Sequence, residues 1–280
     1  MPQRHHTTTP AGRTAQDRAR RALSQNFLAD PAAIRRFARS VPGNPPGLVV
    51  EIGAGDGRIT TALAEHAEHV IAYEIDPRLA RRLRARCDDL PNVRCVQQDF
   101  LKVRAPREPF HLAGNIPYSA TSRIVSWTLN APGVLTATFI TQLEYARKRT
   151  GDYGRWSLLT VQNWPEFTWR LGERIDRGRF RPVPRVDAGI LRLDRRARPL
   201  IPPTALDDYR ACVALGFQGK GGTLRASLRR AYPHARVDAA FRAARLHPGT
   251  VVAHAHPDQW ITLFRALHQI GPSSARASDG

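Results

Sequence analysis

Between residues 48 and 195 the chain alternates short apolar runs with stretches of helical periodicity. Apolar segments of strand length lie at 48–53, 69–76, 92–100, 110–115, 134–144, 167–172 and 188–194. Helical stretches follow the first two of them, at 58–67 and 77–89. Strands that alternate with helices are typical of βαβ units, so the pattern predicts an α/β domain with a largely parallel sheet.

The pattern changes after the Pro-rich segment 197–203, which reads as a linker. The remaining periodic stretches are helical, at 206–217, 223–232, 237–246 and 257–270. The sequence therefore predicts a sheet domain over 22–196 and a small all-helical domain over 197–270. Residues 1–21 are expected to form a flexible basic arm, and 271–280 a disordered tail.

The chain is strongly basic. Its 280 residues include 43 Lys and Arg against 24 Asp and Glu, a formal net charge of +19. Such an excess suits a polyanionic partner, and guanidinium groups suit phosphate in particular. Nucleic acid is the favoured partner, most directly at the basic segments 145–156 and 170–198, and an anionic membrane surface is the alternative.

Little else in the composition points to special chemistry. Three scattered cysteines form neither a disulfide framework nor a metal-ligand spacing, which favours a reducing cytoplasm and no metal. No apolar run reaches the length of a membrane span, and the first 22 residues lack the apolar core of a secretory signal. We therefore expect a cytoplasmic protein without a membrane anchor.

A Gly-rich turn joins the first predicted strand to a helix in VVEIGAGDGRIT (49–60). Gly53, Gly55 and Gly57 permit positive φ and a close approach of the backbone to a ligand. The spacing is G-x-G-x-G, which differs from the G-x-G-x-x-G dinucleotide fingerprint, and no phosphate-loop Lys-Ser/Thr follows. By itself the turn is only modest evidence for a ligand-binding site.

Acidic residues at the ends of the next two strands strengthen the evidence for a ligand site at this turn. Glu74 follows Gly53 by 21 residues, a distance that places an acid where it can accept from ribose hydroxyls. A solvated strand-end carboxylate is the alternative, and Asp76 is expected to cap the helix that starts at Pro77. Asp99 ends the third strand, where it can accept from an adenine amine, with Phe100 beside the ring. Together these strand ends predict a ligand that contains adenosine.

The fourth strand ends in AGNIPYSAT (113–121), which could be a simple strand-to-helix turn. It also offers two acceptors for an exocyclic amine, the Asn115 side-chain oxygen and the Ile116 carbonyl held by Pro117. Two acceptors on the amine hydrogens favour its nucleophilic geometry and stabilise the charge of methyl transfer. Tyr118 can stack on an extruded base. The pattern predicts methylation of an adenine amine.

Six motifs, in this order, resemble the S-adenosylmethionine-dependent rRNA adenine N6-methyltransferases. They are LSQNFLAD (23–30), VVEIGAGDGRIT (49–60), YEID (73–76), QDF (98–100), NIPYSAT (115–121) and RFRPVPRVDAGILRL (179–193), and the resemblance covers 22–270. Two branches of that family compete, the Erm methylases of 23S rRNA and the small-subunit dimethyladenosine transferases. NIPYSAT is similar to the Erm pattern, whereas the second branch typically reads N-L-P-Y-N-I-S.

The resemblance implies a Rossmann-like methyltransferase domain over 22–196 that uses S-adenosyl-L-methionine, followed by a helical RNA-binding domain over 197–270. It implies cofactor contacts from Asn26, Leu28, Gly53, Gly55, Glu74, Asp99 and Asn115. It also implies catalytic roles for Asn115, Tyr118 and Phe180, with Phe180 closing on the target adenine opposite Tyr118. Without the resemblance, a single aromatic such as Phe180 reads as a core residue.

The expected function is N6-methylation of one adenine of 23S rRNA by a monomer, giving macrolide–lincosamide–streptogramin resistance. Small-subunit dimethylation in ribosome assembly is the alternative within the family. A non-catalytic nucleic-acid-binding factor of the same fold is the alternative of another class, against which the intact Asn115–Tyr118 set argues. A DNA adenine methylase is a further option, although those enzymes more often carry an acidic or D-P-P-Y type motif. Whether one or two methyl groups are added stays open.

Overall fold

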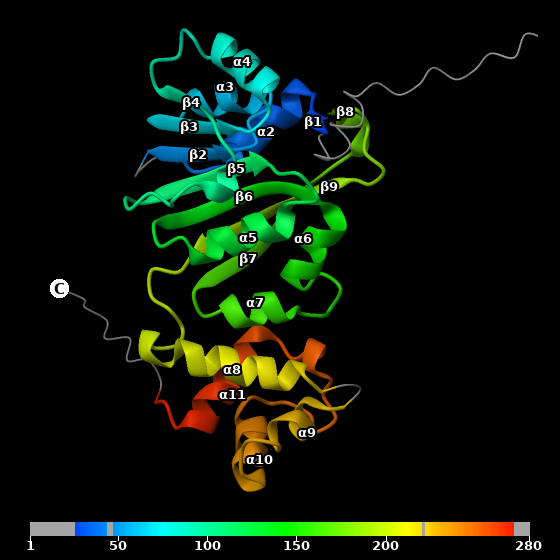
Figure 1. Cartoon of the computed structure of the whole chain (residues 1–280). Coiled ribbons are helices and arrows are strands. Elements are labelled where there is room, and N and C mark those ends of the chain that lie inside the picture. Colours follow the sequence, from blue (N-terminus) through cyan, green and yellow to red (C-terminus); the bar gives the residue numbers. More distant parts are fainter. Residues whose placement is uncertain (1–25, 44–46, 220–221, 272–280) are drawn as a thin grey trace, which may run out of the picture.

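The computed structural model describes residues 26–43, 47–219 and 222–271 (Figure 1). The arm expected at 1–21 and positions 272–280 of the expected tail lie outside these ranges. In the described chain a seven-stranded sheet forms the upper part and a group of helices the lower part. The sheet lies within residues 48–195, and the helices of the lower part follow residue 197.

The sheet is mixed and has the order β4-β3-β2-β5-β6-β9-β7. Its strands are β2 (Leu48–Ile52), β3 (His69–Glu74), β4 (Val93–Gln97), β5 (Phe110–Asn115), β6 (Val134–Gln142), β7 (Phe167–Ile175) and β9 (Ala188–Arg195). The first five pair in parallel, and β9 is antiparallel to both of its neighbours. The predicted strands are confirmed, and all seven belong to one sheet.

Helices cover both faces of this sheet (Figure 1). One face packs against α2 (Pro31–Ser40), α3 (Arg58–Ala64) and α4 (Pro77–Arg86), and the other against α5 (Thr121–Asn130) and α6 (Leu143–Thr150). Neighbouring positions of β2 show why its sequence is apolar at most positions. Val49 faces the α2–α3 side and Val50 the α5 side, and all five β2 residues are buried.

Two helix starts follow directly from the local sequence. Asp76 accepts hydrogen bonds from the backbone N–H groups of Arg78 and Leu79, and Pro77 occupies the first turn of α4. The predicted cap is therefore confirmed. Asp30 caps α2 in the same way through the N–H of Ala33, at 2.7 Å.

The helical part has its own hydrophobic core. It contains α8 (Leu206–Phe217), α9 (Leu224–Leu228), α10 (His234–Ala243) and α11 (Pro257–His268), and the described residues after 197 include no strand. The short helix α7 (Leu158–Asn163) also contributes, because Val161 is buried in this core and its carbonyl accepts from Tyr209 Oη at 2.9 Å. The packing thus includes a segment that precedes the linker, which a boundary placed by composition at 197 does not predict.

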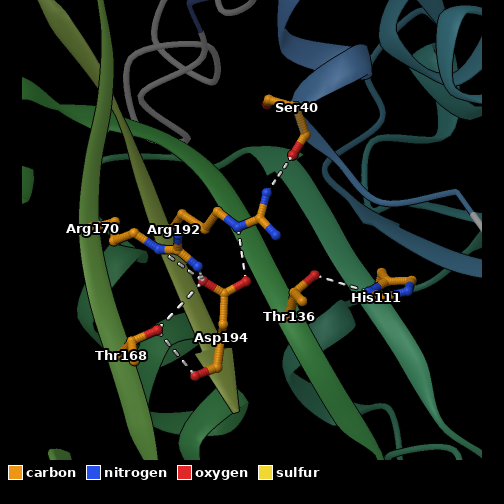
Figure 2. Close-up of polar contacts among 7 residues, drawn as sticks. All are labelled: Ser40, His111, Thr136, Thr168, Arg170, Arg192 and Asp194. Atoms are coloured by element: carbon orange, nitrogen blue, oxygen red, sulfur yellow. Dashed lines mark hydrogen bonds and ion pairs between the residues drawn. The ribbon is translucent and has the colours of Figure 1, made fainter. Parts of the chain in front are cut away.

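A polar network fastens the end of α2 to the far half of the sheet (Figure 2). Arg192 on β9 donates to the Ser40 carbonyl at 2.9 Å and to Asp194 at 2.8 Å. Asp194 also accepts from Arg170 on β7, at 2.6 Å. The network joins α2, β9 and β7, and it pairs two arginines of the basic segment 170–198 with one carboxylate.

Glu51, on β2, is a carboxyl group inside the sheet domain. It is 1% exposed and accepts a hydrogen bond from Thr60 Oγ1 at 2.5 Å. Its pKa is raised to about 8, mainly by burial and to a smaller extent by nearby Glu74, against the lowering effect of the Thr60 hydrogen bond. The group is therefore protonated in the folded protein at neutral pH.

We predict that Glu51→Gln removes a pH-dependent penalty. The folded-state pKa lies above the unfolded value, so this group favours folding below about pH 4.5, and that contribution is lost as the pH rises through about 8. Urea unfolding at pH 5 and pH 8.5 measures the effect: the variant should gain stability over the wild type at the higher pH, by a few kcal/mol. Exposed Glu65→Gln is the control, and a Glu51→Gln difference that is the same at both pH values contradicts the prediction.

Candidate active site

Four strand ends meet at one edge of the sheet. Because β2 to β5 run parallel, their carboxyl ends lie together, marked by Gly53, Glu74, Asp99 and Asn115. The strand order reverses between β2 and β5, and in open α/β sheets such a switch point is where ligands bind. The structure therefore brings together the residues that the sequence placed on separate strands.

The Gly-rich turn has the backbone that its glycines predict. Gly53, Gly55 and Gly57 have φ of 66°, 61° and 87°, all in the left-handed region. A Cβ on Gly55 would lie 3.0 Å from the Phe27 ring, whereas one on Gly53 would meet nothing closer than the Asn115 carbonyl oxygen at 3.8 Å. Phe27 therefore packs over the turn at Gly55, and Gly53 faces outward.

Glu74 is a buried carboxylate rather than a solvated one. It is 3% exposed, and it accepts from the Gly55 N–H and the Asp76 N–H, each at 2.8 Å. Burial raises its pKa, while these backbone hydrogen bonds lower it. Each oxygen keeps a second lone pair, so the two hydrogen bonds orient the carboxylate and leave it able to accept from a ligand hydroxyl.

The end of β4 differs from expectation in one residue. Asp99 is half-buried and caps the short helix Phe100–Lys102 by accepting from the Leu101 N–H at 3.0 Å. Phe100 is buried, and the centroid of its ring lies 4.5 Å from that of the Trp127 ring. It is therefore a core residue and does not flank a ligand ring. The apolar side chain left exposed at this edge is Ile75, 48% exposed directly after Glu74.

The NIPY segment is both a turn and a set of fixed polar groups. The Pro117 carbonyl accepts from the Ala120 N–H at 2.9 Å, which starts α5, so the reading as a strand-to-helix turn is correct. Asn115 Nδ2 donates to the Asn26 carbonyl at 2.6 Å. This hydrogen bond fixes the orientation of the side-chain amide, with Oδ1 as the acceptor at its opposite end. Asn26 thus contributes a backbone atom that fixes the side chain expected to act on the substrate.

Tyr118 carries a buried hydroxyl. The residue is half-buried, and Oη has no hydrogen-bond partner among the described residues. Burial raises the pKa of its phenol, and the nearby Asp187 carboxylate raises it further. The phenol therefore stays protonated at neutral pH, with a donor available.

Phe180 and Leu28 lie side by side in the core. They pair across a two-stranded antiparallel ribbon formed by β1 (Phe27–Leu28) and β8 (Phe180–Arg181). Phe180 is 0% exposed and Leu28 3% exposed, and both pack in the cluster under α2. A ring without exposed area cannot face a base in this conformation, so a catalytic contact from Phe180 requires β8 to move.

Asp187, near Tyr118, is a residue that the sequence did not single out. Its carboxylate accepts from Arg174 at 2.6 Å and from the Arg177 N–H at 3.0 Å, and its carbonyl accepts from the Leu143 N–H at 3.0 Å. It thereby fixes the loop 176–187 beside Tyr118. Among the described residues no cluster of metal-ligating side chains occurs, and none of the helices could cross a membrane.

The chain belongs to the ribosomal RNA adenine dimethylase family, whose model matches residues 16–269. An rRNA adenine N-6-methyltransferase of Streptomyces fradiae is 58% identical over 255 residues, 90% of this chain and 80% of that protein. The mycinamicin-resistance protein MyrB of Micromonospora griseorubida is 36% identical over 258 residues, 92% of this chain and 82% of its own.

A solved structure agrees. The crystal structure of the 23S rRNA methyltransferase ErmE superposes with a TM-score of 0.84 at 51% identity, over 87% of this chain and 100% of that one. The expectations of an Erm-type rRNA adenine N6-methyltransferase and of a Rossmann-like methyltransferase fold are confirmed. Members of this family are methyltransferases, which use S-adenosylmethionine.

We predict that Gly55→Ala destabilises the protein more than Gly154→Ala. Both glycines have positive φ, 61° and 64°, so both alanines carry a similar backbone cost, about 1 kcal/mol. A Cβ on Gly154 meets no atom within 4 Å, whereas one on Gly55 displaces the Phe27 ring. Denaturant unfolding measures the difference, and equal losses of stability would show that Phe27 does not pack over the turn.

Proposed function

We propose that this protein transfers methyl groups from S-adenosylmethionine to N6 of one adenine in 23S rRNA, giving resistance to macrolide-type antibiotics. The single observation that carries the proposal is the held amide of Asn115 at the carboxyl end of β5, next to the Gly-rich turn. The 23S target is supported by the ErmE match, and resistance by the likeness to MyrB.

The edge of the sheet fits an adenosyl cofactor. Because Gly53 has no side chain, a ligand can approach its backbone closely. Two N–H groups hold Glu74 in position to accept hydrogen bonds from ribose hydroxyls. Asp99 at the next strand end provides the acceptor for the adenine amine, and exposed Ile75 provides an apolar surface for the ring. When bound, this cofactor supplies an electrophilic methyl group.

Asn115 is the residue that acts on the substrate amine. Its Nδ2 is engaged by the Asn26 carbonyl, so Oδ1 is the end that accepts a hydrogen from the adenine N6. The Ile116 carbonyl provides the second acceptor. Because two acceptors oppose delocalisation of the nitrogen lone pair into the ring, they raise its nucleophilicity and stabilise the positive charge that develops on it.

Tyr118 is proposed to stack on the adenine once the base has left its own stack. Its ring follows Pro117 directly, and Asp187 fixes the neighbouring loop. Phe180 remains the candidate for the opposite side of the base only if β8 opens, since its ring is fully buried here.

The basic segments around this edge are proposed to contact RNA phosphates. The arginines of these segments are not equally available to phosphates. Arg170 forms an ion pair with Asp194, and Arg174 forms one with Asp187. Arg181, on the end of β8, and Arg185, on the loop after it, form no ion pair among the described residues, but Arg181 donates to the carbonyls of Gly178 and Phe180, at 2.8 Å each. Arg185 is exposed, and we propose that it contacts the RNA backbone.

Small-subunit dimethylation is the competing assignment within the family. SAT after NIPY favours the 23S branch, as does 51% identity with ErmE. Incubation with labelled S-adenosylmethionine and either naked 23S rRNA, small ribosomal subunits or duplex DNA, followed by mapping of the base, tests it. We expect labelling at an adenine of 23S rRNA. Labelling of small subunits alone would show that the target is small-subunit rRNA and not 23S rRNA.

We predict that Asn115→Ala lowers kcat on 23S rRNA by about 10² to 10³, the usual loss when one preorganised polar group is removed from a transition state. The Kd for RNA should change little. The free energy of unfolding should fall by about 1 kcal/mol through loss of the hydrogen bond to Asn26. Single-turnover methylation, RNA binding and urea unfolding measure the three quantities.

The matched control is Asn130→Ala. The side-chain amide of Asn130 also donates to a backbone carbonyl, that of Ser126 at 2.8 Å. Asn130 is the last residue of α5, whereas Asn115 precedes that helix. It should retain full activity. Full activity of Asn115→Ala would refute the role of its amide in activating the amine.

A further inference from the structure

The helical part contains a hollow that the proposed chemistry does not use. It has a volume of about 340 Å³ and lies where the chain leaves α10 and turns toward α11. Three basic side chains line it, Arg245, His247 and His254, and all three residues are exposed. No acidic residue lines it, and Val251, 50% exposed, adds an apolar surface. This lining suits an anion that carries an apolar group, as a nucleotide does.

A local turn fixes the tautomer of the neutral His247 ring, which lines the hollow. Its Nδ1 accepts a hydrogen bond from the Gly249 N–H at 3.0 Å. In the neutral ring the proton must therefore sit on Nε2. The local turn thus fixes the tautomer that can donate to an anion.

Arg245 occupies a position that glycine normally takes. Its φ is 52°, in the left-handed region, and it is the C′ residue of α10 in a Schellman arrangement in which the Leu246 N–H donates to the Phe241 carbonyl. A side chain there costs on the order of 1 kcal/mol relative to glycine. Gln259 holds the strained residue by donating to the Ala244 carbonyl at 3.2 Å. The φ of Arg245 belongs to the way α10 ends, and the same turn brings its side chain to the lining of the hollow.

The hollow is connected to the catalytic edge through α6. The Ala253 carbonyl, next to His254, accepts from the Trp156 N–H at 2.7 Å, in the turn that follows α6. The other end of α6 begins at Leu143, whose N–H donates to the carbonyl of Asp187 beside Tyr118. The helix has eight residues and spans about 12 Å, with Lys148 and Arg155 exposed on it and on the turn after it.

We propose that this hollow binds a phosphate of the rRNA at a nucleotide several positions away from the methylated adenine. The proposal rests on the proposed function, because it takes the RNA bound at the catalytic edge to continue along α6. Arg245 and His247 donate to the phosphate oxygens, and Val251 contacts the sugar or base. The site contributes to affinity for long RNA and has no part in the methyl-transfer step.

The test replaces both donors while keeping the local backbone, in the double variant Arg245→Asn/His247→Asn. Asparagine tolerates the left-handed conformation at the first position, and at the second its Oδ1 can accept from the Gly249 N–H. The control is Arg242→Asn, which removes one charge from the exposed side of α10 outside the hollow. Thermal unfolding verifies the fold of each variant. Kd is measured over a range of salt with full-length 23S rRNA and with a short hairpin that contains only the methylated adenine and its immediate neighbours.

The double variant should weaken binding of 23S rRNA about tenfold, the loss of roughly one charge-assisted hydrogen bond. The slope of log K against log salt should fall by about 1 to 2. Its Kd and kcat on the short hairpin should equal those of the wild type. An unchanged Kd for 23S rRNA, or a loss no larger than that of Arg242→Asn, overturns the proposal, and so does an equal loss on both RNAs.

Two further outcomes are distinguished. If inorganic phosphate or AMP binds the wild type but not the double variant, while 23S rRNA affinity is the same for both, the hollow is a site for a small anion and the RNA assignment is wrong. If the wild type methylates neither RNA, the proposed function fails, and the 23S rRNA binding comparison still decides whether the hollow contacts RNA.

Discussion

The hydrogen bond from the Gly55 N–H to Glu74 joins the ends of β2 and β3, and the arrangement of the candidate site depends on it. It requires a backbone with positive φ at Gly55 and a carboxylate buried at the end of β3. Burial makes the charged form costly, and the second N–H, from Asp76, offsets part of that cost. A conformation that is strained for other residues and a desolvated acid thus stabilise each other at the ligand edge.

A second constraint acts from the N-terminal segment. Asn26 holds the amide of Asn115, Phe27 packs on Gly55, and Leu28 pairs with Phe180. Three consecutive residues therefore contact the Gly-rich turn, the NIPY segment and the loop before β9. This explains why a short segment far from the sheet in sequence belongs to the site: it closes one side of the edge and orients the group proposed to act on the substrate.

The arginines have two different roles in the structure. Some, such as Arg192 and Arg170, are fixed by carboxylates or carbonyls and connect elements of the sheet domain (Figure 2). Exposed pairs of this kind stabilise the fold only slightly, but they neutralise charge that would otherwise face RNA. Others lie on loops and on the hollow of the helical part without an acidic neighbour. Composition alone does not separate these groups, because pairing depends on which strands become neighbours.

Four features could be predicted from the amino-acid sequence alone: the seven strands of the main sheet, the glycines with positive φ, the cap at Asp76 and the alignment of four strand ends. These follow from local periodicity and from the parallel βαβ pattern, in which the carboxyl ends of strands share an edge. The sequence also singled out Asn115 through the chemistry of its neighbours. The family resemblance added Asn26, whose backbone carbonyl accepts a hydrogen bond from Asn115.

Which side chains at that edge are exposed depends on the folded chain as a whole. It buried Phe100 and Phe180 in the core, exposed Ile75, and made Asp187 the residue that fixes the loop beside Tyr118. It also placed Val161 in the core of the helical part and put a strained arginine at the end of α10. The physical reason is common to these cases: burial and pairing are set by contacts between residues far apart along the chain, which local patterns of polarity do not contain.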